Sequence, residues 1–253
     1  MADQYQQPGG AAAVNEAGQM RSDLPSANAD GTRVLALIPA YNAAAHVAGV
    51  VRAARAHLPV LVVDDGSTDL TGQEAEAGGA LVRRQEPNQG KGAALQHGLR
   101  WALAEGYEAV LTLDADGQHD PSEIPAFLAC YARTRSELII GARDFSRMPL
   151  VRRVANTIGR WAFSWALGRS VRDNQSGYRL LHRRLIELVL ASQERGYEFE
   201  MDMIVTAVRH GLRVESVPIR TIYADEESHI RPLAHVAHFA RMVWQTRRAL
   251  RQR

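Results

Sequence analysis

Residues 34–69, VLALIPAYNAAAHVAGVVRAARAHLPVLVVDDGSTD, contain the pattern from which the architecture of the chain follows. Two short apolar runs, at 34–39 and 59–65, flank a stretch over 42–57 in which the apolar residues have helical spacing. A strand, a helix and a second strand in this order predict a right-handed βαβ unit with parallel strands. Each run is apolar at consecutive positions, which is typical of strands that are covered on both faces.

The same alternation extends to residue 143. Three further apolar runs alternate with three further helical stretches, so the sequence predicts an α/β fold with a mostly parallel, Rossmann-like central sheet and helices on both faces. The later strands are expected at 80–85, 107–116 and 137–143, and the later helices at 68–78, 90–106 and 120–131.

After Pro149 the pattern becomes less regular, although no internal repeat is present. The expected elements are a long helical stretch at 150–168, an irregular segment at 171–181, helices near 182–192 and 200–210, and a strand pair within 213–223.

The chain of 253 residues is long enough for one large domain, which is expected over 32–232. Residues 1–31 are rich in Ala, Gly, Gln and Asn and lack an apolar core of about 7 to 15 residues, so they predict a disordered tail rather than a signal peptide. Residues 233–253 combine basic and apolar residues and predict a C-terminal basic amphipathic helix.

Composition excludes several classes of protein. The net charge of +2 is too small to suggest nucleic-acid binding, and no stretch approaches the ~20 uninterrupted apolar residues of a membrane span. Cys130 is the only cysteine, so no internal disulfide can form and a reducing, cytoplasmic location is expected. The first strand ends in PAYN rather than in GxGxxG, so the dinucleotide fingerprint of a nicotinamide or flavin enzyme is missing.

Polar residues gather where the expected strands end. In open α/β sheets, ligands bind outside the carboxyl ends of the strands, so these segments are expected to form one site. The five segments are PAYN (39–42), DDGSTD (64–69), QEPNQGKG (85–92), DADGQHD (114–120) and GARD (141–144).

Asp114 and Asp116 are the first candidate metal ligands. They stand two apart at the end of an expected strand, so their carboxylates should lie on the same side and repel each other unless a hard divalent cation joins them. Gly117 permits a sharp turn that can bring the amide oxygen of Gln118 to the same ion. Mg²⁺ or Mn²⁺ with open coordination positions suits substrate phosphates. The alternative interpretation is a strand end with an Asx turn and a helix cap.

Lys91 is the only lysine in the chain and stands between Gly90 and Gly92. The surrounding residues do not match GxxxxGK[ST], so the segment is not a P-loop. At a helix start, glycines allow an anion to approach closely, and a compact ammonium can pair with a carboxylate or a phosphate. The alternative is a solvated lysine at a helix start. Asp64 is a candidate partner for a nucleotide base or ribose, whereas residues 67–69 are suited to cap a helix.

Seven segments, in this order along the chain, resemble the family 2 inverting glycosyltransferases. They are ALIPAYN, VVDDGSTD, NQGKGAAL, LDADGQH, GAR, DNQSGYRLL and YEFEMD, and the resemblance covers about residues 33–232. Within the family, the chain looks most similar to the branch of dolichol-phosphate mannose synthase and related polyprenyl-phosphate glycosyltransferases. The resemblance implies a GT-A fold, a nucleotide-sugar donor and inversion at the anomeric carbon.

Together, the strand-end positions and the resemblance nominate individual residues. The candidate nucleotide-binding residues are Pro39, Tyr41, Asp64, Asp65, Lys91 and Asp114, and the candidate metal ligands are Asp114, Asp116 and Gln118. The candidate catalytic residues are Lys91, Arg143, Asp173 and Glu200, with Ser176, Gly177 and Arg179 close to the reaction centre. The candidate contacts to an acceptor phosphate are Arg143, Arg152 or Arg153, and Asn156. Ser228-His229 stands where mannose synthases tend to carry a Ser-Lys pair, so the mannosyl donor and the phosphate acceptor are left open.

These observations predict a metal-dependent glycosyltransferase that moves a sugar from a GDP- or UDP-sugar to a lipid-linked acceptor, with polyprenyl phosphate favoured. A phosphate acceptor is already ionised near pH 7, whereas a hydroxyl acceptor in a glycan or glycolipid requires a general base such as Asp173, Glu200 or Asp202. A sugar nucleotidyltransferase is disfavoured because PAYNAAAH lacks an arginine-bearing, glycine-rich turn. A non-catalytic binding protein at the membrane surface is the remaining alternative.

Two stretches combine arginine with aromatic residues. RRVANTIGRWAFSWALGR (152–169) and HVAHFARMVWQTRRALRQR (235–253) predict basic amphipathic helices on an anionic leaflet, to which each arginine adds about 1 kcal/mol. The alternative is a helix packed on the sheet and a solvated tail. The expected location is therefore peripheral, on the inner face of the cytoplasmic membrane. The expected partners are a nucleotide sugar, a lipid-phosphate or glycan acceptor and the anionic membrane surface, and not nucleic acid.

Overall fold

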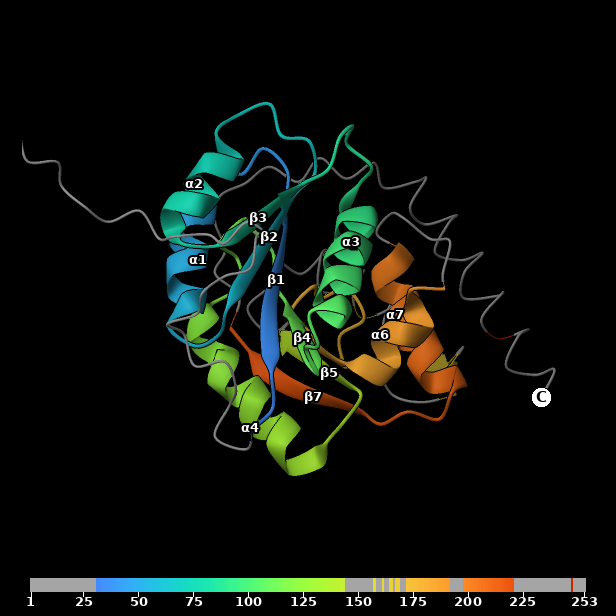
Figure 1. The fold of residues 1–253 in the computed structure, drawn as a ribbon. Coiled ribbons are helices and arrows are strands. Elements are labelled where there is room, and N and C mark those ends of the chain that lie inside the picture. Colours follow the sequence, from blue (N-terminus) through green and yellow to red (C-terminus); the bar gives the residue numbers. More distant parts are fainter. Residues whose placement is uncertain are drawn as a thin grey trace, which may run out of the picture.

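The computed structural model describes residues 31–143, 172–191 and 198–220, together with positions 157, 161, 164, 165, 167, 168 and 247. Within these ranges, the strands form one seven-stranded sheet in the order β3-β2-β1-β4-β6-β5-β7 (Figure 1). The strands are β1 (Val34–Ala40), β2 (Val60–Asp64), β3 (Leu81–Arg84), β4 (Ala109–Thr112), β5 (Leu138–Arg143), β6 (Arg179–His182) and β7 (Val214–Ile219). The helices are α1 (Val47–Arg55), α2 (Thr71–Gly78), α3 (Lys91–Ala104), α4 (Ile124–Thr134), α6 (Arg183–Val189) and α7 (Glu198–Arg209), with a 3₁₀ turn, η1 (Pro121–Glu123).

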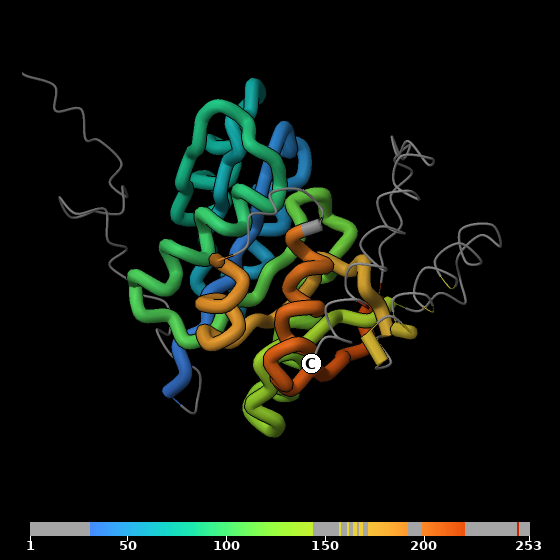
Figure 2. The backbone as a smooth tube through the Cα atoms, turned by 90° about the vertical axis from the view of Figure 1, so that its right-hand side faces the viewer, coloured from blue at the N-terminus to red at the C-terminus, as the bar shows by residue number. Residues whose placement is uncertain are grey.

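Two layers of helices cover the sheet, one on each face. In Figure 1, α1, α2 and α4 lie on one side of the strands and α3, α6 and α7 on the other; Figure 2 views the molecule from the side of α3, α6 and α7. Successive residues of a strand point to opposite faces, so β1 sends Ala36 and Ile38 into one apolar cluster and Leu35 and Leu37 into the other. Both faces are therefore buried, and the predicted α/β fold with a mostly parallel sheet is confirmed.

One strand in the middle of the sheet runs against its neighbours. β6 is antiparallel to both β4 and β5, and Leu180 lies opposite Leu111 on one side and Ile139 on the other. The prediction of an irregular segment at 171–181 was therefore wrong for its last residues, because the run RLLH is too short to show the period of a strand. Since β6 is reversed, its amino end lies at the same edge as the carboxyl ends of β1, β4 and β5, and it brings the loop 172–178 to that edge.

The turn after β4 also differs from the expectation. β4 ends at Thr112, so Asp114 and Asp116 lie in the turn that follows and not on extended chain. The Asp116 carboxylate accepts a hydrogen bond from the main-chain amide of Gln118, and Gly117 has a φ of +77°. An acidic side chain that bonds its own backbone two residues on favours a turn over a continued strand.

Two further elements differ in extent. α1 begins at Val47 rather than near residue 42, because residues 43–46 form a turn. Within the strand pair expected at 213–223, β7 is a single strand that pairs in parallel with β5.

Several expectations lie outside the described residues: those for positions 1–30, for Arg152, Arg153 and Asn156, for residues 221–232 with Ser228-His229, and for 233–253 apart from Arg247. The predicted domain boundaries therefore stay predictions.

Gly98 packs α3 tightly against β1. A Cβ atom on Gly98 would lie 2.3 Å from Cδ1 of Leu37, which is fully buried. Helix propensity favours Ala over Gly by about 1 kcal/mol, but forcing an extra carbon into a filled core costs ~1–3 kcal/mol. We therefore expect Gly98→Ala to lower the free energy of unfolding, measured by urea denaturation. Gly49→Ala in α1 is the control, because nothing lies within 4 Å of its added Cβ atom. A Gly98→Ala protein as stable as the Gly49→Ala protein would contradict this packing.

Candidate active site

The acidic turn after β4 is held in shape by its own hydrogen bonds. The main-chain amide of Asp114 donates to Nδ1 of His119 at 3.1 Å, and that of Gln118 donates to Oδ1 of Asp116 at 2.9 Å. The His119 ring is buried, and its centroid lies 5.1 Å from that of the Tyr178 ring. The turn therefore presents its two carboxylates at the carboxyl edge of the sheet, and His119 supports it as a hydrogen-bond acceptor.

Asp65 fixes the start of α3. Its carboxylate accepts hydrogen bonds from the main-chain amides of Gln89 and Gly90 at 2.9 and 2.8 Å, and from Nε2 of Gln85 at 2.5 Å. Because Asp65 is buried, these bonds are shielded from water and hold the segment before α3 in place. In this structure Asp65 positions Lys91, the first residue of α3. Its contact with a nucleotide stays a prediction.

Lys91 joins acids from two distant segments of the chain. Its ammonium lies 2.6 Å from Oδ1 of Asp114 and 3.2 Å from Oε1 of Glu200, near the start of α7. Burial raises the pKa of Asp114, but the Lys91 ammonium outweighs it and holds that pKa at about 2. Burial lowers the pKa of Lys91, but the two carboxylates outweigh it and raise that pKa above its ordinary value. The Lys91 ammonium and the Asp114 carboxylate are therefore both charged at neutral pH.

Gly177 allows the loop before β6 to approach these acids. A Cβ atom on Gly177 would lie 3.0 Å from Oδ2 of Asp114 and 3.0 Å from Oε1 of Glu200. The carbonyl oxygen of Gly177 accepts a hydrogen bond from Oγ1 of Thr112 at 2.8 Å, so the loop is fixed at this distance. A side chain at this position would push the two carboxylates apart, which explains why glycine is needed here.

Asp116 carries a charge that its surroundings disfavour. Burial and the neighbouring Asp114 carboxylate raise the pKa of Asp116. A divalent cation would relieve this repulsion, and carboxylate and amide oxygens are ligands that Mg²⁺ and Mn²⁺ take. Asp114, Asp116 and Gln118 therefore fit such an ion chemically. Across the residues that the structure describes, no group of three or more His, Cys, Asp or Glu side chains is arranged to hold a metal, so substrate oxygens would have to complete the coordination.

Arg143, the last residue of β5, forms a bidentate ion pair with Asp173. Its Nε and Nη2 atoms donate to the two carboxylate oxygens at 2.7 and 3.1 Å. The amides of Gln175 and Ser176 donate to the same carboxylate at 3.0 and 3.2 Å. The Asp173 side chain is buried, whereas 19% of the Arg143 side chain is exposed. The positive charge of Arg143 also helps to lower the pKa of Asp114, so the Arg143–Asp173 pair interacts electrostatically with the acidic turn.

Arg179 supports the site from behind. The sequence places it close to the reaction centre, but its side chain is fully buried. Its guanidinium donates to the main-chain oxygens of Ser176 at 2.7 Å and Asn174 at 3.1 Å, and to that of Glu200. These bonds join the loop before β6 to the start of α7. No sequence signal marks this role in a chain whose basic residues are nearly all arginine.

The predicted nucleotide-binding residues of β1 and β2 have different surroundings. Pro39 is buried in β1, whereas Tyr41 is 51% exposed just beyond it. Asp64 is buried, and its carboxylate accepts hydrogen bonds from the Ser67 amide at 2.9 Å and from Nη1 of Arg84 at 3.1 Å. Asp64 thus holds the end of β2 to the edge strand β3, an ion pair that sequence reasoning missed. The contacts of these residues with a nucleotide stay predictions.

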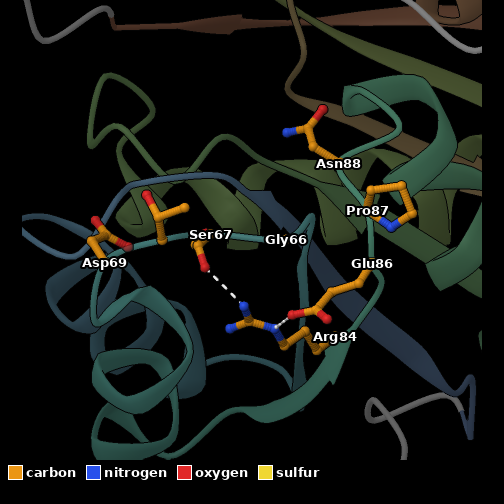
Figure 3. Close-up of a pocket in the computed structure, with 8 residues that line it drawn as sticks. Gly66, Ser67, Asp69, Arg84, Glu86, Pro87 and Asn88 are labelled. Carbon is orange, nitrogen blue, oxygen red and sulfur yellow. Dashed lines mark hydrogen bonds and ion pairs between the residues drawn. The ribbon is translucent and has the colours of Figure 1, made fainter.

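An open depression of about 810 Å³ lies at the ends of β2 and β3. In Figure 3, the loop 66–69 and the segment 84–88 face each other across it, and Nη2 of Arg84 donates to the Ser67 carbonyl oxygen at 2.8 Å. None of the acids around Lys91 lines this depression. The lining comes instead from the loop after β2 and from the end of β3 with the segment that follows it.

The charge of Asp116 should reduce stability. Its folded pKa is raised, so folding is favoured while it is protonated and stability is lost as the pH rises through that pKa. We expect Asp116→Asn to raise the melting temperature in EDTA at pH 7, with a smaller gain at pH 4. Asp69 is the opposite control, because hydrogen bonds from Thr71 lower its pKa and stabilise the charged form. Asp69→Asn should lower the melting temperature at pH 7. An Asp116→Asn protein less stable than the original would contradict the assignment.

Comparisons with known proteins agree on one family. The model of the glycosyl transferase family 2 matches residues 36–188. The undecaprenyl-phosphate mannosyltransferase of Micrococcus luteus is 36% identical over 206 residues, which cover 74% of this chain and 82% of that protein. The polyprenol monophosphomannose synthase of Mycolicibacterium smegmatis is 32% identical, with coverages of 74% and 76%. The UDP-N-acetylglucosamine–dolichyl-phosphate N-acetylglucosaminyltransferase of Methanococcus voltae is 31% identical, with coverages of 75% and 85%.

Solved structures show the same architecture. Glucosyl-3-phosphoglycerate synthase from Mycobacterium tuberculosis, in complex with phosphoglyceric acid, superposes with a TM-score of 0.65 at 25% identity and covers 86% of this chain and 79% of its own. Its complex with Mn²⁺, UDP and glucosyl-3-phosphoglycerate gives a TM-score of 0.62 at 25% identity, with the same coverages. The chain therefore belongs to glycosyl transferase family 2 and has the GT-A fold.

Proposed function

We propose that this family 2 glycosyltransferase moves a sugar, with inversion, from a GDP- or UDP-sugar to the phosphate of a polyprenyl lipid. The observation that carries the proposal is that cations reach this edge from both sides of β4: Lys91 comes from α3, which packs on β1 and β2, and Arg143 comes from β5 beyond β6. Two cations around one reaction centre suit a reaction in which the donor and the acceptor both carry phosphate. Relatives are named for undecaprenyl-phosphate, polyprenol and dolichyl-phosphate substrates, which supports this acceptor class.

The donor diphosphate is assigned to the side of α3. Lys91 is the first residue of this 14-residue helix, where main-chain N–H groups and the helix dipole favour an anion. Gly90, which has a φ of +91°, lets the backbone approach the phosphates closely. Asp114, Asp116 and Gln118 would hold Mg²⁺ or Mn²⁺, which supplies neutralisation of the charge that develops on the leaving diphosphate. Neighbouring solved structures that contain Mn²⁺ and UDP support this assignment.

The acceptor phosphate is assigned to the side of Arg143. Asp173 holds the guanidinium plane in one orientation, and the amides of Gln175 and Ser176 in turn hold Asp173. A guanidinium fixed in this way is pre-oriented for a phosphate and loses little freedom when it binds one. Arg143 then positions the acceptor oxygen for in-line attack on the anomeric carbon, opposite the leaving diphosphate.

The hydrogen bonds and ion pairs that the nearby acids already form favour a phosphate acceptor over a hydroxyl acceptor. Asp173 accepts from Arg143 and from two amides, and Glu200 lies against Lys91. Asp202 lies two residues further along α7, and residues two apart on a helix point in different directions. These three acids are therefore poorly placed to remove a proton. A phosphate monoester is already ionised near pH 7 and needs no base. A hydroxyl acceptor does need a base, so transfer to a hydroxyl is the second candidate.

An acceptor assay tests this proposal. The purified protein is incubated with Mn²⁺, a panel of GDP- and UDP-sugars, and either a short polyprenyl phosphate or the matching polyprenol. We expect glycolipid formation only with the phosphate, and a loss of at least tenfold in kcat/KM for the acceptor in an R143Q/D173N variant. This double variant replaces the two charges by similar shapes, so that no buried carboxylate is left unpaired. Arg183→Gln, an exposed arginine on α6, is the control. Equal turnover of the polyprenol would refute the phosphate acceptor.

We also propose that the enzyme lies on an anionic membrane surface, where such an acceptor resides. Trp161 and Trp165 are 72% and 52% exposed and stand four residues apart in helical conformation, so they share a helix face. The Arg247 guanidinium lies 3.6 Å from the centroid of the Trp165 ring and donates to the Trp165 carbonyl oxygen. Aromatic rings with adjacent arginine are suited to the headgroup region of an anionic bilayer. In the described part of the chain, no helix is long and apolar enough to span a membrane.

Vesicle co-sedimentation tests the membrane contact. We expect the W161A/W165A variant to bind phosphatidylglycerol vesicles at least tenfold more weakly than the original protein, because both aromatic anchors are removed. Leu70→Ala is the matched control, since Leu70 is another exposed apolar residue, 56% exposed, in the loop between β2 and α2. Binding to phosphatidylcholine vesicles should be weak for all three proteins. Unchanged binding of the double variant would rule out this helix face as the contact.

A further inference from the structure

The ammonium of Lys91 lies on one of the candidate metal ligands. It is 2.6 Å from Oδ1 of Asp114, closer than it is to Oε1 of Glu200 at 3.2 Å. An ammonium and a divalent cation bind the same carboxylate oxygens, and their positive charges repel each other. We propose that Lys91 competes with the divalent cation for Asp114, so that the cation binds tightly only together with the donor diphosphate. This inference rests on the metal-dependent function proposed above.

The charges of the cluster are consistent with such an exchange. Asp114, Asp116 and Glu200 contribute three carboxylates, and Lys91 contributes one ammonium. An ammonium on Asp114 together with a divalent cation would balance the three acids but would place two repelling cations on the same carboxylate. A diphosphate brings further negative charge and gives the ammonium a second anion to contact. The lysine and the cation can then be bound side by side without sharing Asp114.

Lysine is the residue type that can change partners in this way. Every other basic residue of the chain is arginine, and only position 91 carries a lysine. An ammonium on a flexible four-carbon stem can turn from one oxygen to another, whereas a planar guanidinium is held by bidentate contacts in one geometry. An arginine here would be expected to remain on the two carboxylates.

Glu200 provides a contact that does not belong to the acidic turn. It is buried near the start of α7, and its main-chain oxygen is held by Arg179. An ammonium that leaves Asp114 can therefore keep Glu200 as a partner and remain within the site. Glu200 acts as a positioning residue for Lys91 in this scheme, and not as a general base.

The consequence is a coupling between two ligands. If the nucleoside diphosphate raises the affinity for the cation, the cation must raise the affinity for the nucleoside diphosphate by the same factor. Lys91 would be the origin of much of this factor, because it weakens cation binding when no diphosphate is bound. The alternative is a purely structural lysine that holds Asp114 in place, and its removal would then weaken cation binding.

Mn²⁺ binding, followed through the electron paramagnetic resonance signal of the free ion, separates these two roles. It is measured for the original protein, K91M and K91R, with and without UDP or GDP. We expect K91M to bind Mn²⁺ at least tenfold more tightly without nucleotide, and its gain on adding nucleotide to be at least tenfold smaller. K91R should bind Mn²⁺ no more tightly than the original protein under either condition. Arg133→Met, at the exposed end of α4, controls for the loss of one positive charge.

The K91M/E200Q variant tests local competition against overall charge. Replacing both residues leaves the net charge of the cluster unchanged, because one ammonium and one carboxylate are removed together. If Lys91 competes directly with Mn²⁺ for Asp114, this variant should still bind Mn²⁺ more tightly than the original protein. If only the net charge of the cluster affects Mn²⁺ binding, the two proteins should bind it with equal affinity. It also avoids leaving Glu200 buried without its partner.

The outcomes distinguish this inference from the proposed function. If K91M and K91M/E200Q both retain their melting transitions and bind Mn²⁺ no more tightly than the original protein, Lys91 does not compete with the cation. The proposed metal-dependent function would survive that result, because the original protein would still bind Mn²⁺ with nucleotide. If the original protein binds no Mn²⁺ even with UDP or GDP, the metal-dependent function and the inference both fail.

Discussion

An ammonium shared between two carboxylates holds the carboxyl edge of the sheet together. Lys91 begins α3, Asp114 follows β4 and Glu200 lies near the start of α7, so three segments meet at one charge. Opposite charges attract more strongly in a partly buried setting than in bulk water. Without the ammonium, the acids would repel one another across the same small space. The surrounding contacts of Asp65, Gly177 and Arg179 all serve to bring these charged groups to their positions.

Three charged groups around this edge are fixed by main-chain atoms. Asp65 accepts from two amides, Asp173 accepts from two amides, and Arg179 donates to three carbonyl oxygens. Charged groups that are already oriented in this way need not reorganise when a substrate charge appears, and such preorganisation is the main source of electrostatic catalysis. The cost is a set of buried charges whose partners must all be present. The charged groups of the site are therefore held in fixed orientations, but substitution of any one of them leaves a buried charge without its partner.

The sequence allowed most of the sheet and part of the site to be predicted. β1, β2 and β4 are runs of apolar residues at consecutive positions, and this pattern depends only on burial of both faces. β6 was missed because its identity as a strand depends on pairing with β4 and β5, which are distant in the sequence. Asp114 and Lys91 could be placed at one edge because parallel strands share their carboxyl ends.

The partners of the charged residues could not be predicted in the same way. An acidic residue shows its charge in the sequence, but its role depends on which amide or cation the fold brings to it. Asp173 was a candidate catalytic group, and the structure makes it the buried support of Arg143. The pairing of Lys91 with Glu200 depends on how α7 packs beside α3, and nothing in either helix specifies that contact locally.

The reversed direction of β6 has a consequence for how this enzyme can vary. β5 and β6 are antiparallel, hydrogen-bonded neighbours, so the carboxyl end of β5 and the amino end of β6 lie at the same edge of the sheet. The ion pair between Arg143 and Asp173 joins two residues that are 30 apart in sequence at this edge. Loop-closure entropy changes only slowly with loop length. A change in the length of the chain between these two residues should therefore alter the free energy of unfolding only slightly, provided that β5 and β6 stay paired.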